Sequence, residues 1–255
     1  MNFKKSVSAF SVLLFAAFSS FAQDKPGTLA ALEFQTPKTG AAKQYEDGRK
    51  QKADWHKQQK DTQPLYVWET LTGEATGTYI VGRLGLHWAD LDKPSVPDQA
   101  DLDQYNKLVG PFVQSIVARD YEFMPKVSNP PPDSATPSKF SDIITYHVRP
   151  GHGGDFDSAI ARVNDAVQKT KWPVNYFVYA LVSGGASGTY VLVFPHANWA
   201  DFEDKPDLKP FRDMLKDAFG QSEADSIIKR FDASIDSETS AIVKFRPELS
   251  HIPGK

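Results

Sequence analysis

The sequence predicts an α+β protein made of two tandem halves, each with the element order β-α-β-β-α-β. One observation is a repeat: residues 77–94 read GTYIVGRLGLHWADLDKP, and residues 188–206 read GTYVLVFPHANWADFEDKP. With an offset of 111 residues, nine aligned positions in and just before these segments are identical. A second observation is that strand-like and helix-like stretches follow the same order on both sides of a proline-rich segment. A period of this length indicates a duplicated domain and not a short solenoid repeat.

Each half opens with a predicted strand and a predicted helix. Residues 29–36 and 142–149 carry bulky and β-branched side chains before a Pro or Gly, which is typical of strands. The next stretches, residues 41–60 and 154–171, have helical character and end shortly before a proline.

A β-hairpin is predicted next in each half. Residues 65–71 and 78–84 flank the turn TGEATG, and residues 176–182 and 189–194 flank the turn SGGASG. Two strand-like runs joined by a short loop that contains glycine are typical of a hairpin.

A second helical region and a last strand complete each half. In the first half, apolar residues as far as Ile116 predict a helix that is kinked at Pro111. In the second half, Ser222 is a possible helix cap. The closing strands are expected near residues 121–127 and 240–245.

Between the halves lies SNPPPDSATPS, residues 128–138, which has the composition of a linker because proline fixes an extended chain. It separates a first half, residues 23–127, from a second half, residues 139–255. The unit is the ferredoxin-like arrangement, a four-stranded sheet with helices on one face. The bare face of such a sheet needs a cover. We therefore expect the two halves to pack sheet to sheet as an α+β barrel.

With this element order, and with a hairpin followed by Trp-Ala-Asp, the chain resembles the dimeric α+β barrel superfamily in its fused tandem form. The resemblance extends over nearly all of the chain after residue 22 and points to no specific family. It implies a pocket between the sheet and the helices of a half. The superfamily includes cofactor-free monooxygenases, haem enzymes and proteins of no known activity. No haem-ligand motif of the superfamily is carried over to this sequence, so no cofactor is expected.

The N-terminal segment, residues 1–22, has the layout of a secretory signal peptide. Two lysines precede an apolar run too short to span a bilayer comfortably, and small residues precede an expected cleavage between Ala22 and Gln23. A retained membrane anchor is the less favoured alternative. We therefore expect a periplasmic or secreted protein without a membrane partner after cleavage.

Charge and composition limit the classes of partner and metal site that this protein can have. Removal of the signal changes the formal net charge from −3 to −5, because the segment contains two lysines and no acidic residue. An acidic surface disfavours nucleic acid as the partner. The chain has no cysteine, so disulfides are excluded and any metal site must use His, Asp and Glu.

The two halves disagree on the inner face of the first helix. In the second half this face carries an apolar stripe of Phe156, Ile160, Val163 and Val167, spaced to face a sheet. The same offset leads to the following residues in the first half: Tyr45, Arg49, Lys52 and His56. Burial of such groups without partners costs several kcal/mol, so this face should meet a ligand, water or acidic side chains.

This face is our candidate ligand site. Arg49 and Lys52 would hold an anionic or carboxylate-bearing small molecule, and His56 would donate or accept a proton near neutral pH. Tyr45 and Tyr79 are further candidate ligand-binding residues. The alternative is that the helix is simply more exposed, or is rotated so that Tyr45, Gly48 and Trp55 point inward.

The repeated Trp-Ala-Asp has two interpretations. Trp88 and its counterpart Trp199 could line a ligand pocket, which makes Trp88 a candidate ligand-binding residue. Alternatively, Asp90 and Asp201 accept hydrogen bonds from the first turn of a helix, with the tryptophan packed beneath. The second interpretation is favoured, because both halves need the same joint.

The remaining histidines do not have the spacing of a recognised metal site, so no metal is predicted. The sequence contains no nucleophile elbow, no phosphate-binding P-loop and no His-Glu-x-x-His motif. SGGASG is interpreted as a hairpin turn, since no helix follows it.

Three functions are compatible with these features. The preferred one is an exported protein that binds a small organic ligand, most simply an anion, in the first half. The first alternative is a cofactor-independent oxygenase or isomerase that uses His56 as the base and Arg49 to hold a substrate anion. The second is a structural or interaction protein whose interior is filled by its own side chains. Whether a reaction is catalysed is left open, and so is the oligomeric state.

Overall fold

The computed structural model describes residues 26–132 and 136–254. The predicted signal peptide and cleavage position lie outside the described residues, as do residues 133–135 of the predicted linker. In the described part of the chain, no helix combines the length and the apolar character needed to cross a membrane.

The first half has the predicted order of elements. These are β1 (Leu29–Pro37), α1 (Ala42–Gln58), β2 (Tyr66–Thr70), β3 (Tyr79–Leu86), α2 (Asp98–Leu108) and β4 (Val113–Phe123). Short 3-10 turns lie between or after them: η1 (Trp88–Asp92), η2 (Gly110–Phe112) and η3 (Pro125–Val127).

The second half repeats this order, with its second helix divided in two. The strands and helices are β5 (Phe140–Val148), α3 (Gly153–Thr170), β6 (Phe177–Ser183), β7 (Thr189–His196), α4 (Phe211–Phe219), α5 (Gln221–Ser234) and β8 (Ile235–Phe245). The 3-10 turns are η4 (Trp199–Phe202) and η5 (Pro247–Leu249).

The eight strands form one closed barrel in the order β1-β3-β2-β8-β5-β7-β6-β4. Within each half the sheet has the ferredoxin-like order, and every strand pair is antiparallel. Pairs between the halves close the barrel, β2 with β8 and β4 with β6. The two sheets therefore cover each other, as predicted, and are also joined at their edges.

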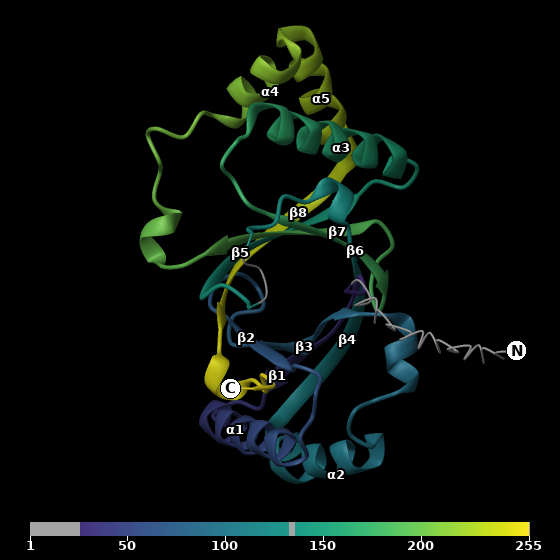
Figure 1. Ribbon diagram of the computed structural model, residues 1–255, viewed down its shortest axis with the longest axis vertical. Helices are drawn as coiled ribbons and strands as arrows, with labels where there is room; N and C mark the ends of the chain where they lie inside the picture. The colour runs from purple at the N-terminus through teal and green to yellow at the C-terminus, as the bar shows by residue number, and fades with distance from the viewer. Residues whose placement is uncertain (1–25, 133–135, 255) are drawn as a thin grey trace, which may run out of the picture.

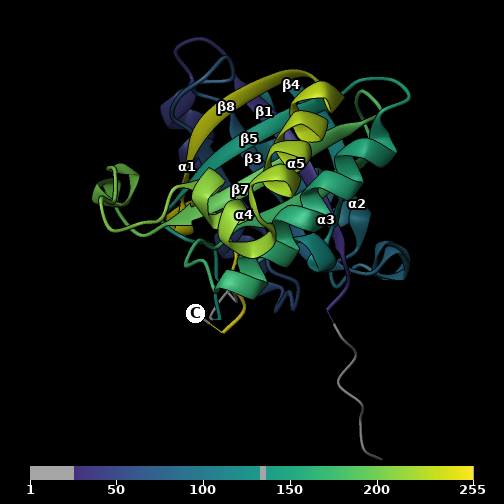
Figure 2. The same cartoon turned by 90° about the horizontal axis from the view of Figure 1, so that it is seen from above.

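The barrel has an apolar interior and a helical layer on two opposite sides. Tyr66, Trp68 and Ile80 from the first half pack inside it with Val243 and Phe245 from the second. Figure 1 shows α1 and α2 on one side of the barrel and α3, α4 and α5 on the other. Figure 2 shows α3, α4 and α5 lying over the sheet of the second half.

The repeated glycines have a backbone reason. Gly73 and Gly77 have φ angles of +86° and +82°, and their counterparts Gly184 and Gly188 have +88° and +74°. Side chains are disfavoured at positive φ, so both hairpin turns need glycine at these positions. The repeated glycines are therefore explained by the geometry of the two hairpin turns.

The predicted kinked helix in the first half is wrong. Helix α2 ends at Leu108, Pro111 lies in η2, and Ile116 lies in β4, which begins eight residues earlier than expected. Pro111 ends the helical region where a kink was predicted, because proline lacks the N–H that a continuing helix needs. In the second half Gly220, and not Ser222, occupies the N-cap of α5.

Each half is completed by a serine that follows the last strand of the other half. Ser250, after η5, accepts a hydrogen bond from Val67 N at 2.9 Å and donates to Arg246 O at 2.8 Å. Ser128, after η3 and at the start of the predicted linker, accepts from Val178 N at 2.9 Å and donates to Met124 O at 2.8 Å. The C-terminal segment of each half thus crosses onto the sheet of the other.

Candidate functional site

The candidate site is the inner face of α1, which points toward β1, β2 and β3. Tyr45, Arg49, Lys52 and His56 are all buried there, and none is more than 4% exposed. At the equivalent positions of α3, Phe156, Ile160 and Val167 belong to the apolar core of the second half, and Val163 packs against it. The register predicted from the repeat is therefore the register of the fold. Gly48 is also buried, whereas Trp55 is partly exposed.

Arg49 is buried among uncharged partners. Its Nε donates to the Tyr45 hydroxyl at 3.1 Å, and its Nη2 donates to the side-chain oxygen of Gln35. The guanidinium also lies 5.5 Å from the ring centre of Tyr45 and 5.6 Å from that of Tyr105. Among the residues that the structure describes, no carboxylate forms an ion pair with Arg49.

One turn further along α1, Lys52 and His56 share a carboxylate of α2. Lys52 Nζ lies 2.9 Å from His56 Nε2 and donates to Asp101 Oδ1. His56 Nε2 is 3.2 Å from the same oxygen. Because an ammonium can only donate, His56 Nε2 accepts from Lys52, and the ring proton of a neutral His56 resides on Nδ1.

The other nitrogen of His56 faces a second carboxylate. His56 Nδ1 lies 2.8 Å from Asp61 Oδ2, in an orientation outside hydrogen-bond geometry. Asp61 accepts hydrogen bonds from the Ser95 hydroxyl and from Gln63 N, and its Oδ2 is 3.3 Å from Arg83 Nη2. Asp61 is thus a fixed anion behind the imidazole.

His251 covers this pair from the C-terminal segment. Its Nε2 lies 2.8 Å from the backbone oxygen of Asp61, and its ring stacks on that of His56 with 5.6 Å between ring centres. Since a carbonyl oxygen only accepts, Nε2 carries the proton and Nδ1 is an acceptor in neutral His251. A residue of the second half therefore completes the site in the first.

Burial and neighbouring charges shift the pKa values of the cluster. Burial lowers the pKa of Lys52 and outweighs its bond to Asp101. Burial, with the charge of Lys52, lowers the pKa of His56 to about 4. Burial alone would raise the pKa of Asp61, but bonds from Ser95 and Gln63 N and the charge of Arg83 outweigh burial and lower it. At neutral pH the cluster holds a neutral His56 beside an ionised Asp61.

Tyr79 lies at the other end of the same face. Its ring packs 4.6 Å from the ring of Tyr45, and its hydroxyl donates to Glu46 Oε1 at 2.6 Å. Arg246 Nη1 is 2.8 Å from the same oxygen. Burial, with the bond to Glu46, raises the pKa of the Tyr79 hydroxyl. The equivalent Tyr190 bonds to Asp157, so this contact belongs to both halves.

Trp88 does not join the cluster. It lies on η1 with 54% of its surface exposed, and its counterpart Trp199 is 53% exposed. The aspartates of the repeat form capping boxes: Asp90 Oδ2 accepts from His87 N at 2.7 Å, and Asp201 Oδ2 accepts from Ala197 N at 2.7 Å. Both aspartates accept backbone hydrogen bonds, but the donors lie just before the turn and not within it. Trp199 packs on Phe140 and Phe202, with ring centres 4.5 Å and 5.4 Å apart, even though about half of its surface is exposed.

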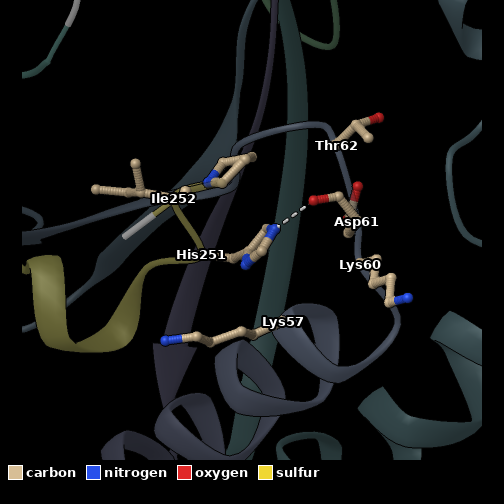
Figure 3. A pocket seen from close by; sticks show the side chains of 8 residues that line it. Lys57, Lys60, Asp61, Thr62, His251 and Ile252 are labelled. Atoms are coloured by element: carbon tan, nitrogen blue, oxygen red, sulfur yellow. Dashed lines mark hydrogen bonds between the residues drawn. The ribbon is translucent and has the colours of Figure 1, made fainter.

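Two shallow depressions lie beside the cluster, where the end of α1 meets the C-terminal segment. One, of about 440 Å³, is lined by residues that include Lys57, Lys60, Thr62 and His251 (Figure 3). The other, of about 340 Å³, shares Lys57 and His251 with the first. In Figure 3 His251 stands between Lys57 and Asp61, with its hydrogen bond to Asp61 drawn as a dashed line.

The other histidines are dispersed. His147 Nδ1 lies 3.1 Å from the Thr189 hydroxyl, His152 is beside Asp155, and His196 packs on the ring of Phe202. In residues 26–132 and 136–254, no group of three or more His, Asp or Glu side chains has the arrangement of a metal site.

Sequence reasoning missed the partners of the predicted residues. These are Gln35, Asp61, Arg83, Ser95, Asp101, Tyr105 and His251. Gln35 and Arg83 had a signal, because their counterparts at the same offset are Tyr146 in the apolar core and Phe194 packed against it. The others lie in the less similar loop, helix and C-terminal segments, where the repeat is no guide.

Comparison with known proteins identifies the class of fold. No family model matches the chain, and no curated protein matches it. The chain is similar to the solved structure of a proposed monooxygenase from Lactobacillus acidophilus NCFM, with 10% identity and a TM-score of 0.53, over 89% of this chain and 97% of that one. The chain therefore has the dimeric α+β barrel fold in a fused, single-chain form.

Two further structures agree with this assignment. One is a proposed monooxygenase from Fusobacterium nucleatum subsp. nucleatum, with 11% identity and a TM-score of 0.53, over 86% of this chain and 93% of that one. The other is an anthrone oxidase-like protein, with 13% identity and a TM-score of 0.50, over 91% and 95%. At such identities the likeness extends to the fold and not to the reaction.

Proposed function

We propose that this protein is exported and binds a small carboxylate-bearing organic molecule in its first half, between α1 and α2. Arg49 is the anion-binding residue, with Tyr45 and Gln35 holding its guanidinium in place. The signal-like segment of residues 1–22 supports export.

The observation that carries the proposal is a buried cation without an ion pair: the carboxylate of Glu33 is linked to Arg49 only through Gln35. Arg49 is 4% exposed, and its side chain contacts a hydroxyl, an amide oxygen and aromatic rings. An ionised group removed from water without an opposite charge costs several kcal/mol. The fold does not need the cation, because Ile160 fills the equivalent place in the second half. A bound carboxylate would supply the missing charge.

A second polar group without a partner lies next to Arg49. The Tyr105 hydroxyl on α2 is buried without a hydrogen-bond partner, and the Arg49 guanidinium lies 5.6 Å from the centre of its ring. Buried polar atoms are nearly always hydrogen-bonded, so an unpaired hydroxyl needs an explanation. A carboxylate beside Arg49 would accept a hydrogen bond from Tyr105.

Helix α2 is the cover that moves to admit the ligand. None of its residues is buried, whereas Met214 and Leu215 of α4 and Ala224 and Ile227 of α5 are buried against the second half. Elements with few buried apolar side chains open at low cost in free energy. Outward movement of α2 takes Asp101 and Tyr105 with it and opens space beside Arg49.

The test is a thermal-shift titration of the chain from Gln23 with benzoate and other aromatic carboxylates. Each acid is compared with its neutral amide, such as benzamide. A ligand that binds only the native state raises the melting temperature. We expect the acids to do so and the amides not to.

Arg49→Ile copies the second half and should abolish the response to acids. Tyr45 still donates to Gln35 in this variant, so no polar group is orphaned. Arg212→Ile removes an exposed arginine as the matched control and should leave the response intact. If no anion raises the melting temperature of the unaltered protein, the buried polar side chains of the first half only fill its interior. The proposal of a ligand-binding protein is then replaced by that of a structural or interaction protein.

The second candidate function is acid–base catalysis on the bound molecule, without a cofactor. Its support is the His56–Asp61 pair: a carboxylate faces Nδ1, and the lowered pKa keeps Nε2 an unprotonated acceptor at neutral pH. Departure of Asp101 with α2 removes one neighbour of Nε2, and Lys52 must also turn toward the carboxylate of the ligand before Nε2 can accept a proton from it. The oxygenase names of the structural relatives fit this class of reaction but do not decide it.

Exchange in D2O separates the catalyst from the binder. The probe is an arylacetate such as phenylacetate, whose α-carbon carries C–H bonds, provided that it raises the melting temperature. It is incubated with the protein, and incorporation of deuterium at the α-carbon is followed by NMR. Loss of exchange in His56→Gln, with an unchanged thermal shift, supports catalysis. If the unaltered protein causes no incorporation of deuterium, it binds the acid without catalysing this reaction.

A further inference from the structure

The outer edge of β4 has no partner over its first half. Strand β4 pairs with β1 from Val113 to Glu122 on one edge. On the other edge it pairs with β6 only from Asp120 to Phe123. In the part of the chain that the structure describes, no strand lies against this second edge between Val113 and Arg119. The hairpin turn at Gly184 packs only against the end of this stretch, at Ala118 and Arg119. The free N–H and C=O groups of such an edge can pair with another strand.

This free edge is uncharged and carries exposed apolar side chains. From Val113 to Ala118 it reads VQSIVA, without a charged side chain. Ile116 is 43% exposed and Val117 is 45% exposed. Proteins normally protect an exposed edge with charged residues, proline or a bulge. The segment contains no charged residue and no proline, and its register against β1 shifts only at Gln114, so Ser115–Ala118 lie in a regular ladder without such protection.

The second half provides an internal comparison. Strand β8 has the place of β4 in that half, and it pairs with β2 only from Val243 to Phe245. Its unpaired part begins IDSETS, which places an aspartate and a glutamate on the edge. Counted from the start of each strand, Ile116 and Val117 correspond to Glu238 and Thr239. One of two equivalent edges is therefore protected by charge, and the other is not.

We propose that β4 pairs with the same strand of a second copy of this chain, antiparallel and about a two-fold axis, to form a homodimer. In such a pair the same segment meets itself, so the sequence must tolerate self-pairing. VQSIVA does, because no like charges come opposite one another, and Ile116 and Val117 are β-branched residues that favour strand pairs. The acidic β8 edge would place Glu238 against acidic residues of its copy and is excluded. This proposal does not depend on the ligand.

The experiment is sedimentation velocity of the chain from Gln23 over a hundredfold range of concentration. We expect a reversible monomer–dimer equilibrium. The double variant Ile116→Glu, Val117→Thr transplants the β8 edge onto β4 and should raise the dimer dissociation constant by about tenfold or more, since like charges opposite each other in a strand pair are destabilising. Hydrogen exchange of the amides of Gln114–Ala118 should slow as the concentration of the unaltered protein rises.

Val182→Thr is the matched control. Val182 is 50% exposed on β6, outside the free edge, so its replacement removes a comparable apolar surface and should leave the dimer unchanged. Far-UV circular dichroism verifies that each variant is folded. A monomer at all concentrations, or a dimer unaffected by the double variant, overturns the proposal. A dimer weakened equally by Val182→Thr also overturns it, because general surface hydrophobicity then explains the association.

Discussion

His56 is the residue at which the cluster senses pH. Its pKa is lowered to about 4 by burial and by Lys52, while an unfolded histidine titrates near 6.5. Between these values the unfolded chain binds a proton that folded His56 does not. Folding stability contributed by neutral His56 is therefore present above pH 6.5 and is lost as the pH falls toward 4.

We expect the free energy of unfolding to fall less steeply over this range in His56→Val, which copies the second half. Asp61 keeps Ser95, Gln63 N and Arg83 in this variant, so its carboxylate stays satisfied. Urea denaturation at a series of pH values measures the slope. His196, whose pKa burial also lowers, contributes equally to both proteins. Identical slopes would show that His56 is not the titrating group.

At this scale the sequence identified one side of the cluster and missed the other. Tyr45, Arg49, Lys52 and His56 were predictable because α3 is an internal reference for which positions of α1 face the sheet. Asp61, Asp101 and His251 have no such reference. Their proximity to His56 depends on how a loop, a second helix and the C-terminal segment pack, and no periodicity encodes that packing.

Among the elements, α1 and α2 meet at a glycine. A Cβ atom built on Gly48 would lie 2.0 Å from the backbone oxygen of Leu108, at the end of α2. Alanine is worth about 1 kcal/mol more than glycine inside a helix, but a backbone carbonyl at this distance has to move. Gly48 therefore sets the distance between the two helices that enclose the candidate site.

Gly48→Ala should lower the free energy of unfolding by about 1–2 kcal/mol, because the clash outweighs the gain in helix propensity. Chemical denaturation measures the change. Gly153→Ala, at the start of α3, is the control: no atom lies within 4 Å of its new Cβ, so its stability should stay unchanged or rise slightly. A higher free energy of unfolding in Gly48→Ala would show that α2 can move away from α1 at no cost in stability.

Most elements were predicted within a few residues, because the hairpin glycines and the apolar periodicity of α3 are strong local signals. The failures lie at β4 and β8, which begin well before the predicted strands. Their first halves are exposed and, in β8, polar, so they lack the alternation that identifies a half-buried strand. The barrel closes because these strands pair at their edges with strands of the other half, so its closure could not be predicted from the sequence either.

Over the whole molecule, Ser128 and Ser250 join the halves into one unit. Each accepts a hydrogen bond from the backbone N–H of a buried valine in the other half. We therefore expect a single cooperative unfolding transition and not one transition for each half.

Ser128→Ala and Ser250→Ala should each reduce the free energy of unfolding by about 1–3 kcal/mol, because a buried N–H loses its partner. Each change should shift the whole transition, whichever half it touches. Ser222→Ala, at an exposed position of α5, should have almost no effect. Two separate transitions in either variant, followed by circular dichroism and tryptophan fluorescence, would contradict the expectation of one unit.

The crossing of the C-terminal segment bears on the order in which the protein can be made. Ser250 and His251 are synthesised long after the first half, yet they cap a strand and cover an imidazole of that half. No nascent fragment that ends before them contains these contacts, so the first half remains unfinished until the second half has been made. A chain destined to be threaded through a translocon would be kept open for passage by the same arrangement.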